Sequence, residues 1–187
     1  MRDRSMTRMH TIPETTAPWV NSLSDLDGTW WVGHTRSRFE KAFAADCRAR
    51  QIGYFLPLIE QVRRYGKKKK RVMVPVFPGY VFFCGSDVDR YEAMTTNRLC
   101  QTIDVPDQPG LIHQLIQIEQ ALSTGVELDP YPHAAVGKRC RVRSGPFRGL
   151  EGVVVQRNDA IRLVLQVDML GQGASLEVDA SLLEPAE

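Results

Sequence analysis

The first regular stretch of the chain changes from a strand-like to a helix-like hydrophobic pattern. The aromatic, apolar run that begins at Trp30 is typical of a strand. Ser37 then precedes Glu40 by three residues, which is the spacing of a helix capping box. Apolar residues follow at helical spacing, at positions Phe39, Ala42, Phe43 and Cys47. We therefore expect a strand followed by a helix over residues 38–51, ending at Gly53.

The next stretch is rich in β-forming residues and turns back on itself at Gly66. The segment YFLPLIEQVRRY begins apolar and ends basic, and the returning segment RVMVPVFPGYVFFC is almost entirely strand-like. Its prolines, Pro75 and Pro78, indicate an edge position or a bend. These patterns predict an extended hairpin with Lys67 to Lys70 at its tip, closed by Gly85.

Three further elements complete a first domain. SDVDRYEAM predicts a short capped helix from about Asp87, CQTIDV predicts a strand, and LIHQLIQIEQAL predicts a helix with its apolar residues on one face. The resulting order β-α-β-β-α-β-α is that of a ferredoxin-like split βαβ domain with one extra helix. The predicted fold class is α+β, with this domain spanning residues 29–123.

The remainder of the chain has the pattern of a linker followed by a small all-β domain. Residues 124–135 contain prolines and no regular period, which is typical of a linker. Beyond them, KRCRVR alternates strictly, and three more short apolar runs are bounded by Gly, Asn or Asp. We expect a small β-barrel over 136–187. Residues 1–28 show no such pattern and are predicted to be a disordered tail.

Positive charge is concentrated in the predicted hairpin. Of the 24 Lys and Arg residues, seven lie between Arg63 and Arg71, and removing these seven charges from the net charge of +2 leaves −5. A patch of this kind on an otherwise ordinary globular composition indicates an anion-binding surface. Nucleic acid is the leading candidate anion.

Other classes of function find little support in the sequence. The four cysteines, at 47, 84, 100 and 140, are too widely spaced for a metal-binding pair and too few for a disulfide scaffold. No nucleophile, metal or phosphate-loop constellation is visible, so we expect neither an enzyme nor a cofactor. No apolar run approaches the roughly 20 residues of a membrane span, and no signal-peptide core follows the N-terminal arginines. A reduced, cytoplasmic protein is the expectation.

Two motifs resemble those of one known family. The first is WWV opening the first strand, FEK near the start of the helix, and FPGYVFF after a basic hairpin. The second is VGKRCRVRSGPFRGLEGVVV, which looks like a KOW module with spaced glycines at 145, 149 and 152. Together they resemble the NusG family of transcription elongation factors, as an N-terminal NusG domain followed by a KOW domain. The KOW resemblance implies that the small barrel is a five-stranded, SH3-like β-barrel. A KOW stretch alone also occurs in ribosomal proteins, so FPGYVFF carries most of the resemblance.

The resemblance implies a surface that binds RNA polymerase, at an apolar cavity that receives the clamp helices of the largest subunit. The candidate residues are Trp31, His34, Phe77, Pro78, Gly79 and Tyr80. From the residues alone, the bend at Pro78 and Gly79 can turn the rings of Phe77 and Tyr80 outward as interface anchors, or both rings can belong to the core.

The resemblance also implies contacts with upstream or non-template DNA and with a partner of the KOW domain. The nucleic-acid candidates are Arg36, Arg38, Arg48, Arg50, Arg63, Arg64, Lys67, Lys68, Lys69, Lys70 and Arg71, and the KOW partner candidates are Phe147, Arg148 and Gly149. Alternatively, the lysine run can be a solvated hairpin tip that prevents edge aggregation, or a nuclear localisation tag. The KOW glycines can serve a structural turn alone.

The predicted function is that of a monomeric bacterial elongation factor that closes the polymerase clamp, suppresses pausing and promotes antitermination. Its KOW domain would recruit a small-subunit ribosomal protein or Rho. The compact, strongly basic hairpin favours a specialised, RfaH-like paralogue, and the strict alternation of the KOW strands favours a barrel that does not switch fold. A housekeeping NusG and a ribosome-associated KOW protein are the alternatives.

Overall fold

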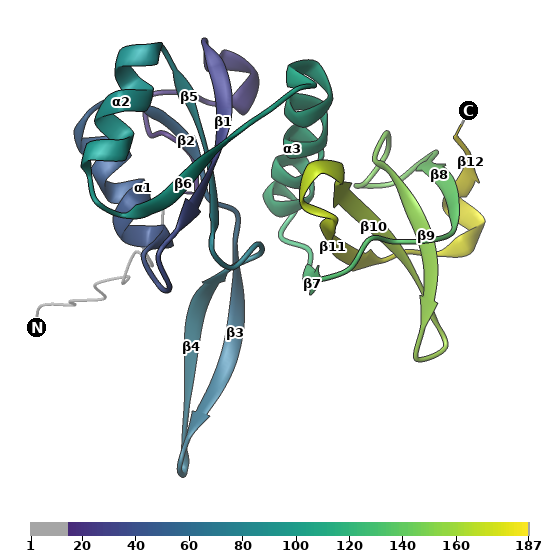
Figure 1. The fold of residues 1–187 in the computed structure, drawn as a ribbon. Coiled ribbons are helices and arrows are strands. Elements are labelled where there is room, and N and C mark those ends of the chain that lie inside the picture. The colour runs from purple at the N-terminus through teal and green to yellow at the C-terminus, as the bar shows by residue number, and fades with distance from the viewer. Residues whose placement is uncertain (1–14, 187) are drawn as a thin grey trace, which may run out of the picture.

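The computed structural model describes residues 15–186, which form two domains that pack against each other (Figure 1). In the first domain, four antiparallel strands form a sheet in the order β2-β5-β1-β6. They are β1 (Thr29–Thr35), β2 (Gly53–Phe55), β5 (Tyr80–Gly85) and β6 (Leu99–Asp104). Helices α1 (Glu40–Ala49) and α2 (Asp87–Thr95) cover one face, and α3 (Gln108–Ser123) covers the other. The predicted ferredoxin-like α+β fold with an extra helix is confirmed.

The alternation of side chains along β1 divides the core of this domain into two layers. Trp30 and Val32 belong to the apolar cluster on the α3 side, whereas Trp31 belongs to the cluster that contains Phe43 and Ala93 of the other two helices. Because successive side chains of a strand point to opposite faces, two adjacent tryptophans can serve both layers. The WWV motif is therefore a two-sided core element.

Helix α1 begins two residues later than the capping-box pattern predicts. Its N-cap is Phe39, which makes no side-chain capping bond, and Arg38 lies outside the helix with a φ of +66°. The predicted Ser37–Glu40 capping box is therefore wrong. The Glu40 carboxylate is bound elsewhere, to the amide of Gly79. By contrast, α2 does begin with a capping box, made by Ser86 and Asp89.

Strands β3 (Leu58–Tyr65) and β4 (Lys68–Pro75) form a separate two-stranded hairpin that projects away from both domains (Figure 1). The two-residue turn consists of Gly66, with a φ of +59°, and Lys67. A glycine with positive φ at the first loop position is what type II′ hairpin turns require. At the base of the hairpin, the ammonium of Lys41 on α1 donates to the Met73 carbonyl oxygen at 2.6 Å.

Part of the predicted disordered tail is ordered. Residues 1–14 lie outside the described part of the chain, but Thr16 forms a bridge with Phe55, and Leu23 is buried beside α3. The Glu119 carboxylate of α3 accepts hydrogen bonds from the Leu23 amide at 3.0 Å and from the Ser22 hydroxyl at 2.9 Å. These contacts bind residues 15–28 to the domain, and they could not be anticipated from a segment with no periodicity of its own.

The second domain is a small antiparallel sheet in the order β12-β8-β9-β10-β11-β7. Its strands are β7 (Asp129–Tyr131), β8 (Lys138–Val142), β9 (Glu151–Arg157), β10 (Ala160–Val167), β11 (Gln172–Glu177) and β12 (Leu183–Pro185). Strands β8 to β11 correspond to the four strand-like runs of the sequence, and β12, which was not located from the sequence, is the fifth strand of the expected count. The sixth, β7, comes from the segment expected to be a linker and pairs with β11.

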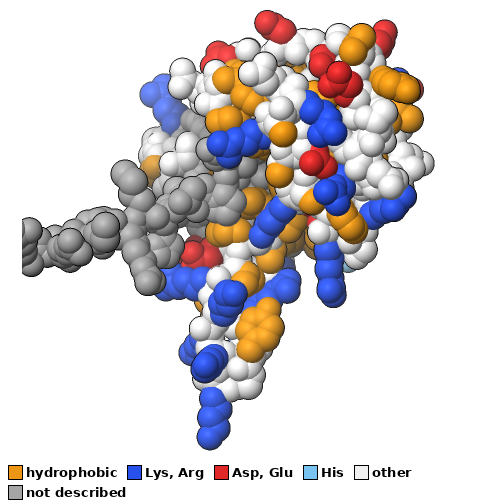
Figure 2. Space-filling model, turned by 90° about the vertical axis from the view of Figure 1, so that its left-hand side faces the viewer, with side chains coloured by type: hydrophobic (Ala, Val, Ile, Leu, Met, Phe, Trp, Pro, Cys, Tyr) orange, Lys and Arg blue, Asp and Glu red, His pale blue; other side chains and the backbone are white. Residues whose placement is uncertain are grey.

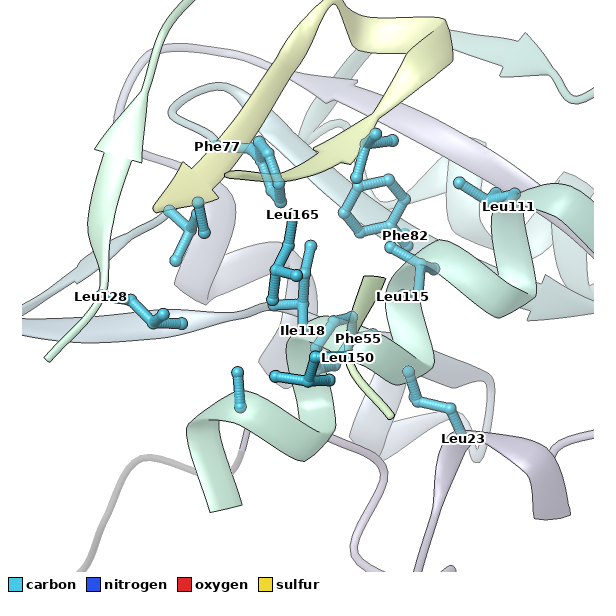
Figure 3. Close-up of a cluster of buried hydrophobic side chains, with 14 of the residues drawn as sticks. Leu23, Phe55, Phe77, Phe82, Leu111, Leu115, Ile118, Leu128, Leu150 and Leu165 are labelled. Atoms are coloured by element: carbon cyan, nitrogen blue, oxygen red, sulfur yellow. The ribbon is translucent and has the colours of Figure 1, made fainter. Parts of the chain in front are cut away.

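Helix α3 is shared by the two domains. Leu115 and Ile118 of α3 belong to one continuous buried cluster with Phe55 and Phe82 of the first domain and with Leu150 and Leu165 of the second (Figure 3). Polar contacts reinforce the junction, since the Gln117 side-chain oxygen accepts from the Glu151 amide at 2.7 Å, and the Gln114 amide group donates to the Asp168 carboxylate at 2.7 Å. The two domains thus share one hydrophobic core in this structure.

Candidate functional site

The FPGY segment forms a turn that is fixed by bonds from two neighbouring elements. The Gly79 amide donates to the Glu40 carboxylate at 2.8 Å, and the Gly79 carbonyl accepts from the Thr35 amide at 2.8 Å. Within the turn, the Tyr80 amide donates to the Phe77 carbonyl at 3.1 Å. The φ of Gly79 is +86°, a conformation that glycine adopts without steric cost. The turn is therefore held in one conformation by β1 and α1.

Beside this turn, two aromatic rings form a stacked pair. His34 lies opposite Tyr80 in the β1–β5 register, and their ring centroids are 5.2 Å apart with an interplanar angle of 24°. Both side chains are half-buried, and Pro78 is exposed. We call His34, Pro78, Gly79 and Tyr80 the PGY surface.

The other two residues predicted for this surface are buried, one in each layer of the core. Phe77 is 1% exposed and packs edge-to-face on Phe82, with ring centroids 5.7 Å apart. Trp31 is 3% exposed, its ring lies 5.6 Å from that of Phe83, and the Arg90 guanidinium sits 5.5 Å from its centroid. The outward orientation considered for Phe77 is not observed, because the bend at Pro78 turns Tyr80 outward and leaves Phe77 in the core.

Glu40 is the residue of this site that the sequence analysis assigned to a different role. It is 8% exposed, yet its carboxylate is satisfied by the Gly79 amide. A signal was present in the sequence, since Glu40 precedes Phe43 by three positions and Ala44 by four, which places it on the buried face of the helix. The capping-box spacing was the competing explanation.

Replacing Glu40 by alanine is expected to reduce the free energy of unfolding by about 1 to 3 kcal/mol, since the Gly79 amide loses its acceptor. Glu40→Gln should cost less because its amide oxygen can still accept this bond. Urea unfolding followed by tryptophan fluorescence measures both variants. Glu92→Ala, which removes an exposed helical carboxylate on α2, is the control and should stay near wild type. If Glu40→Ala and wild type have equal free energies of unfolding, the Glu40–Gly79 hydrogen bond does not contribute to stability.

The predicted nucleic-acid residues fall into separate groups. All seven basic residues of the hairpin are exposed, from Arg63 to Arg71. Figure 2 shows Lys and Arg side chains along the hairpin as far as its tip. One of them, Arg71, is paired with Glu60 at 3.1 Å. The hairpin is therefore a strongly basic projection with a single internal ion pair among its described residues.

The four arginines around α1 do not form one patch. Arg36 and Arg38 precede the helix, and the Arg36 guanidinium donates to the Asn97 side-chain oxygen at 2.9 Å. Arg48 and Arg50 lie at its other end, about 15 Å away by the rise of a ten-residue helix. Asp46 also accepts from Arg98 at 2.9 Å and lies 3.9 Å from Arg50, so it offsets positive charge on this face.

In the second domain, the predicted partner residues lie in the loop between β8 and β9. Phe147 is half-buried against the shared core, whereas Arg148 is exposed. Gly149 has a φ of +90°, and its amide donates to the Val142 carbonyl at 2.8 Å. The Arg148 carbonyl faces the Gln120 side chain of α3 at 3.5 Å. The loop is thus a fixed turn, with Arg148 as its outward residue.

Two of the cysteines are buried packing residues. Burial raises the pKa of the Cys84 thiol to about 12, with a further contribution from the Asp89 carboxylate. Burial likewise raises the pKa of Cys47, and Asp46 adds to it. Within residues 15–186 there is no cluster of His, Cys, Asp and Glu that could hold a metal ion, and no helix there is long and apolar enough to cross a membrane.

Comparison with known proteins gives matches in both domains. Residues 28–113 match the family model described as transcription termination factor nusG, and residues 136–166 match the KOW motif. The chain is also similar to a solved structure described as "Domain interaction in Thermotoga maritima NusG", with 18% sequence identity and a TM-score of 0.45. That match covers 85% of this chain and 97% of the other. No curated protein sequence matches the chain.

Proposed function

Because this chain belongs to the NusG family of transcription factors, we propose that it binds the clamp helices of RNA polymerase through the PGY surface and suppresses pausing. The family acts in transcription elongation and termination. The further steps of the proposal are antitermination, contact with DNA through the hairpin and recruitment of a partner through the KOW domain. We take the protein to act in the cytoplasm as a monomer, one per polymerase.

The observation that carries this proposal is the fixed FPGY turn. An aromatic anchor contributes most to binding when it enters a desolvated pocket and loses little freedom in doing so. The bonds between Gly79 and its partners Glu40 and Thr35, and the stacking of Tyr80 on His34, hold the half-buried Tyr80 ring in place before any partner arrives. Phe77 and Trp31 are buried in the core, so we do not include them among the residues that contact the partner.

The hairpin gives this domain a second, separate contact. It extends away from the sheet that carries the PGY surface (Figure 1), so one domain can touch polymerase and nucleic acid at once. By binding polymerase and nucleic acid together, the protein would favour the closed state of the polymerase clamp over the open state. A preference of about 1.4 kcal/mol changes the ratio of closed to open clamps tenfold. Since Asp46 offsets the charge on α1, we assign the DNA contact to the hairpin and treat the α1 arginines as secondary.

The KOW domain is the proposed site for a further partner, either a small-subunit ribosomal protein or Rho. Arg148 is an exposed charged residue of its β8–β9 loop, and Phe147 is partly buried against the shared core. A specialised, RfaH-like paralogue would not bind Rho, whereas a housekeeping NusG would. Binding of the full-length protein to purified Rho therefore decides between these two forms of the proposal.

The direct test of the function is the lifetime of a defined pause during transcription by purified bacterial RNA polymerase. Adding this protein should shorten the pause. Removing the half-buried ring of Tyr80 should abolish the effect at the same protein concentration. A pause lifetime that is unchanged or longer with the wild-type protein contradicts the proposal.

Replacing Lys67, Lys68, Lys69 and Lys70 together by serine is expected to flatten the salt dependence of binding to a polymerase complex that contains DNA. Each phosphate contact contributes a slope of roughly 0.7 to 0.9 in log affinity against log salt concentration. Titration at several salt concentrations measures the slope. The control replaces two exposed basic residues of the KOW domain, Lys138→Ser with Arg157→Ser, and should leave the slope as it is. Identical slopes for wild type and the four-lysine variant would mean that the tip touches no phosphate.

A further inference from the structure

The two faces of the β3–β4 hairpin carry different side chains. Directly opposed residues of an antiparallel pair share a face, as do residues two positions apart on one strand. The pairs Tyr65–Lys68 and Arg63–Lys70 therefore lie on one face, which we call the Tyr65 face. The pairs Glu60–Met73, Val62–Arg71 and Arg64–Lys69 lie on the other.

The Tyr65 face is the more positive of the two. Its cations are Arg63, Lys68 and Lys70, and no acidic residue of the hairpin shares this face. On the opposite face, Glu60 is paired with Arg71 at 3.1 Å, which neutralises one of the three cations there. An anion that approaches the hairpin is therefore attracted more strongly to the Tyr65 face.

Tyr65 lies among these cations with its ring accessible. It is 58% exposed, and the structure shows no ring stacking or cation–π contact between it and any other described residue. The tight turn at Gly66 and Lys67 puts Lys68 directly across from it. The ring thus contributes nothing to the hydrophobic core and is free to receive a flat partner.

We propose that the Tyr65 face binds single-stranded nucleic acid, with one base stacked on the Tyr65 ring and the flanking phosphates held by Arg63, Lys68 and Lys70. This inference rests on the proposed contact between the hairpin and nucleic acid, and it names the form of nucleic acid and the residue that selects it. Every base has a π face, so stacking on an aromatic side chain is tolerant of sequence. The bases of a duplex are already stacked on each other, so only an unpaired strand can use the ring.

The test is binding of the full-length protein to fluorescein-labelled oligonucleotides of about 12 nucleotides, a length in the range of known single-strand sites. Single-stranded DNA, single-stranded RNA and duplex DNA are compared by fluorescence anisotropy. Tyr65→Ala should weaken single-strand binding about tenfold, a change of about 1.4 kcal/mol, with the salt slope and duplex affinity unchanged. Tyr65→Phe should bind like wild type, and the DNA and RNA arms show which single strand is preferred.

Val62→Ala is the matched control, because Val62 is equally exposed, at 58%, and lies on the opposite face. It should leave every affinity unchanged. If Tyr65→Ala has no effect, or weakens single-strand and duplex binding equally, the stacking role is excluded. In that case, a weaker salt dependence of binding in the four-lysine variant than in wild type would still support the contact between the hairpin and nucleic acid. If wild-type protein binds none of the oligonucleotides in a salt-dependent way, the hairpin contact and the stacking role both fail.

Discussion

Replacing Tyr80 by alanine is expected to weaken binding to bacterial RNA polymerase by roughly thirtyfold or more, which corresponds to about 2 kcal/mol. The expected loss is large because the ring is held in place before binding, by its stacking on His34 at 5.2 Å and by the fixed Gly79 turn. Little conformational entropy is then spent when the partner arrives. Titration of labelled protein against purified core polymerase measures the affinity.

Two further variants separate an interface role of Tyr80 from a structural one. Tyr91→Ala removes a ring that is 69% exposed on α2 and should bind polymerase like wild type. Tyr80→Phe keeps the ring and shows whether the hydroxyl contributes. Urea unfolding of Tyr80→Ala must show a folded protein with a stability near that of wild type. A folded Tyr80→Ala variant that retains wild-type affinity would remove the PGY surface from the proposed interface.

Replacing Ile118 by alanine is expected to reduce the free energy of unfolding by about 2 to 5 kcal/mol, the range for cavities left by large aliphatic side chains in well-packed cores. Ile118 is completely buried in the cluster that joins the two domains. All three tryptophans lie in the first domain, so their fluorescence reports on that domain, whereas far-UV circular dichroism reports on both. Urea unfolding of the wild-type protein by both probes should give coincident transitions.

The control for this prediction is Val136→Ala, because Val136 is 90% exposed and its truncation should change stability by less than about 0.5 kcal/mol. Should the Ile118→Ala variant unfold at the wild-type urea concentration, the cluster would not be the packed core described above. Should the two probes separate in the wild-type protein, the KOW domain would unfold independently and the shared helix would not couple the domains.

Local periodicity was sufficient to predict most elements of this fold. The aromatic, apolar run at Trp30 and Trp31, the helical spacing from Leu111 onward and the turn at Gly66 each depend on a few neighbouring residues. The helical spacing also shows which face of that helix is apolar, and an apolar face indicates both the type of element and its position in the core. The order of elements then limited the topology of the first domain to one common arrangement.

The features that could not be predicted depend on residues far apart in the sequence. Hydrogen bonds join Leu23 to Glu119, Glu40 to Gly79 and Gln117 to Glu151, and no local sequence pattern predicts such pairs. The orientation of Phe77 was undecided for the same reason, since only the packing of Phe82 against it shows that the ring faces inward. At the candidate site, the residues could be predicted from the sequence, but which of them are accessible and which are buried could not.

The apolar side chains of α3 are buried by both domains, so separating the domains would expose them to water. Any ligand of the KOW domain that requires the domains to separate must offset the exposure of the apolar side chains around Ile118, and its apparent affinity falls accordingly. If polymerase binding also favours separation, whichever ligand binds first removes that cost for the second. By reciprocity, each then strengthens the other by the same factor. If both ligands favour separation, one buried helix is enough to make occupancy of the two surfaces cooperative, without any contact between the ligands.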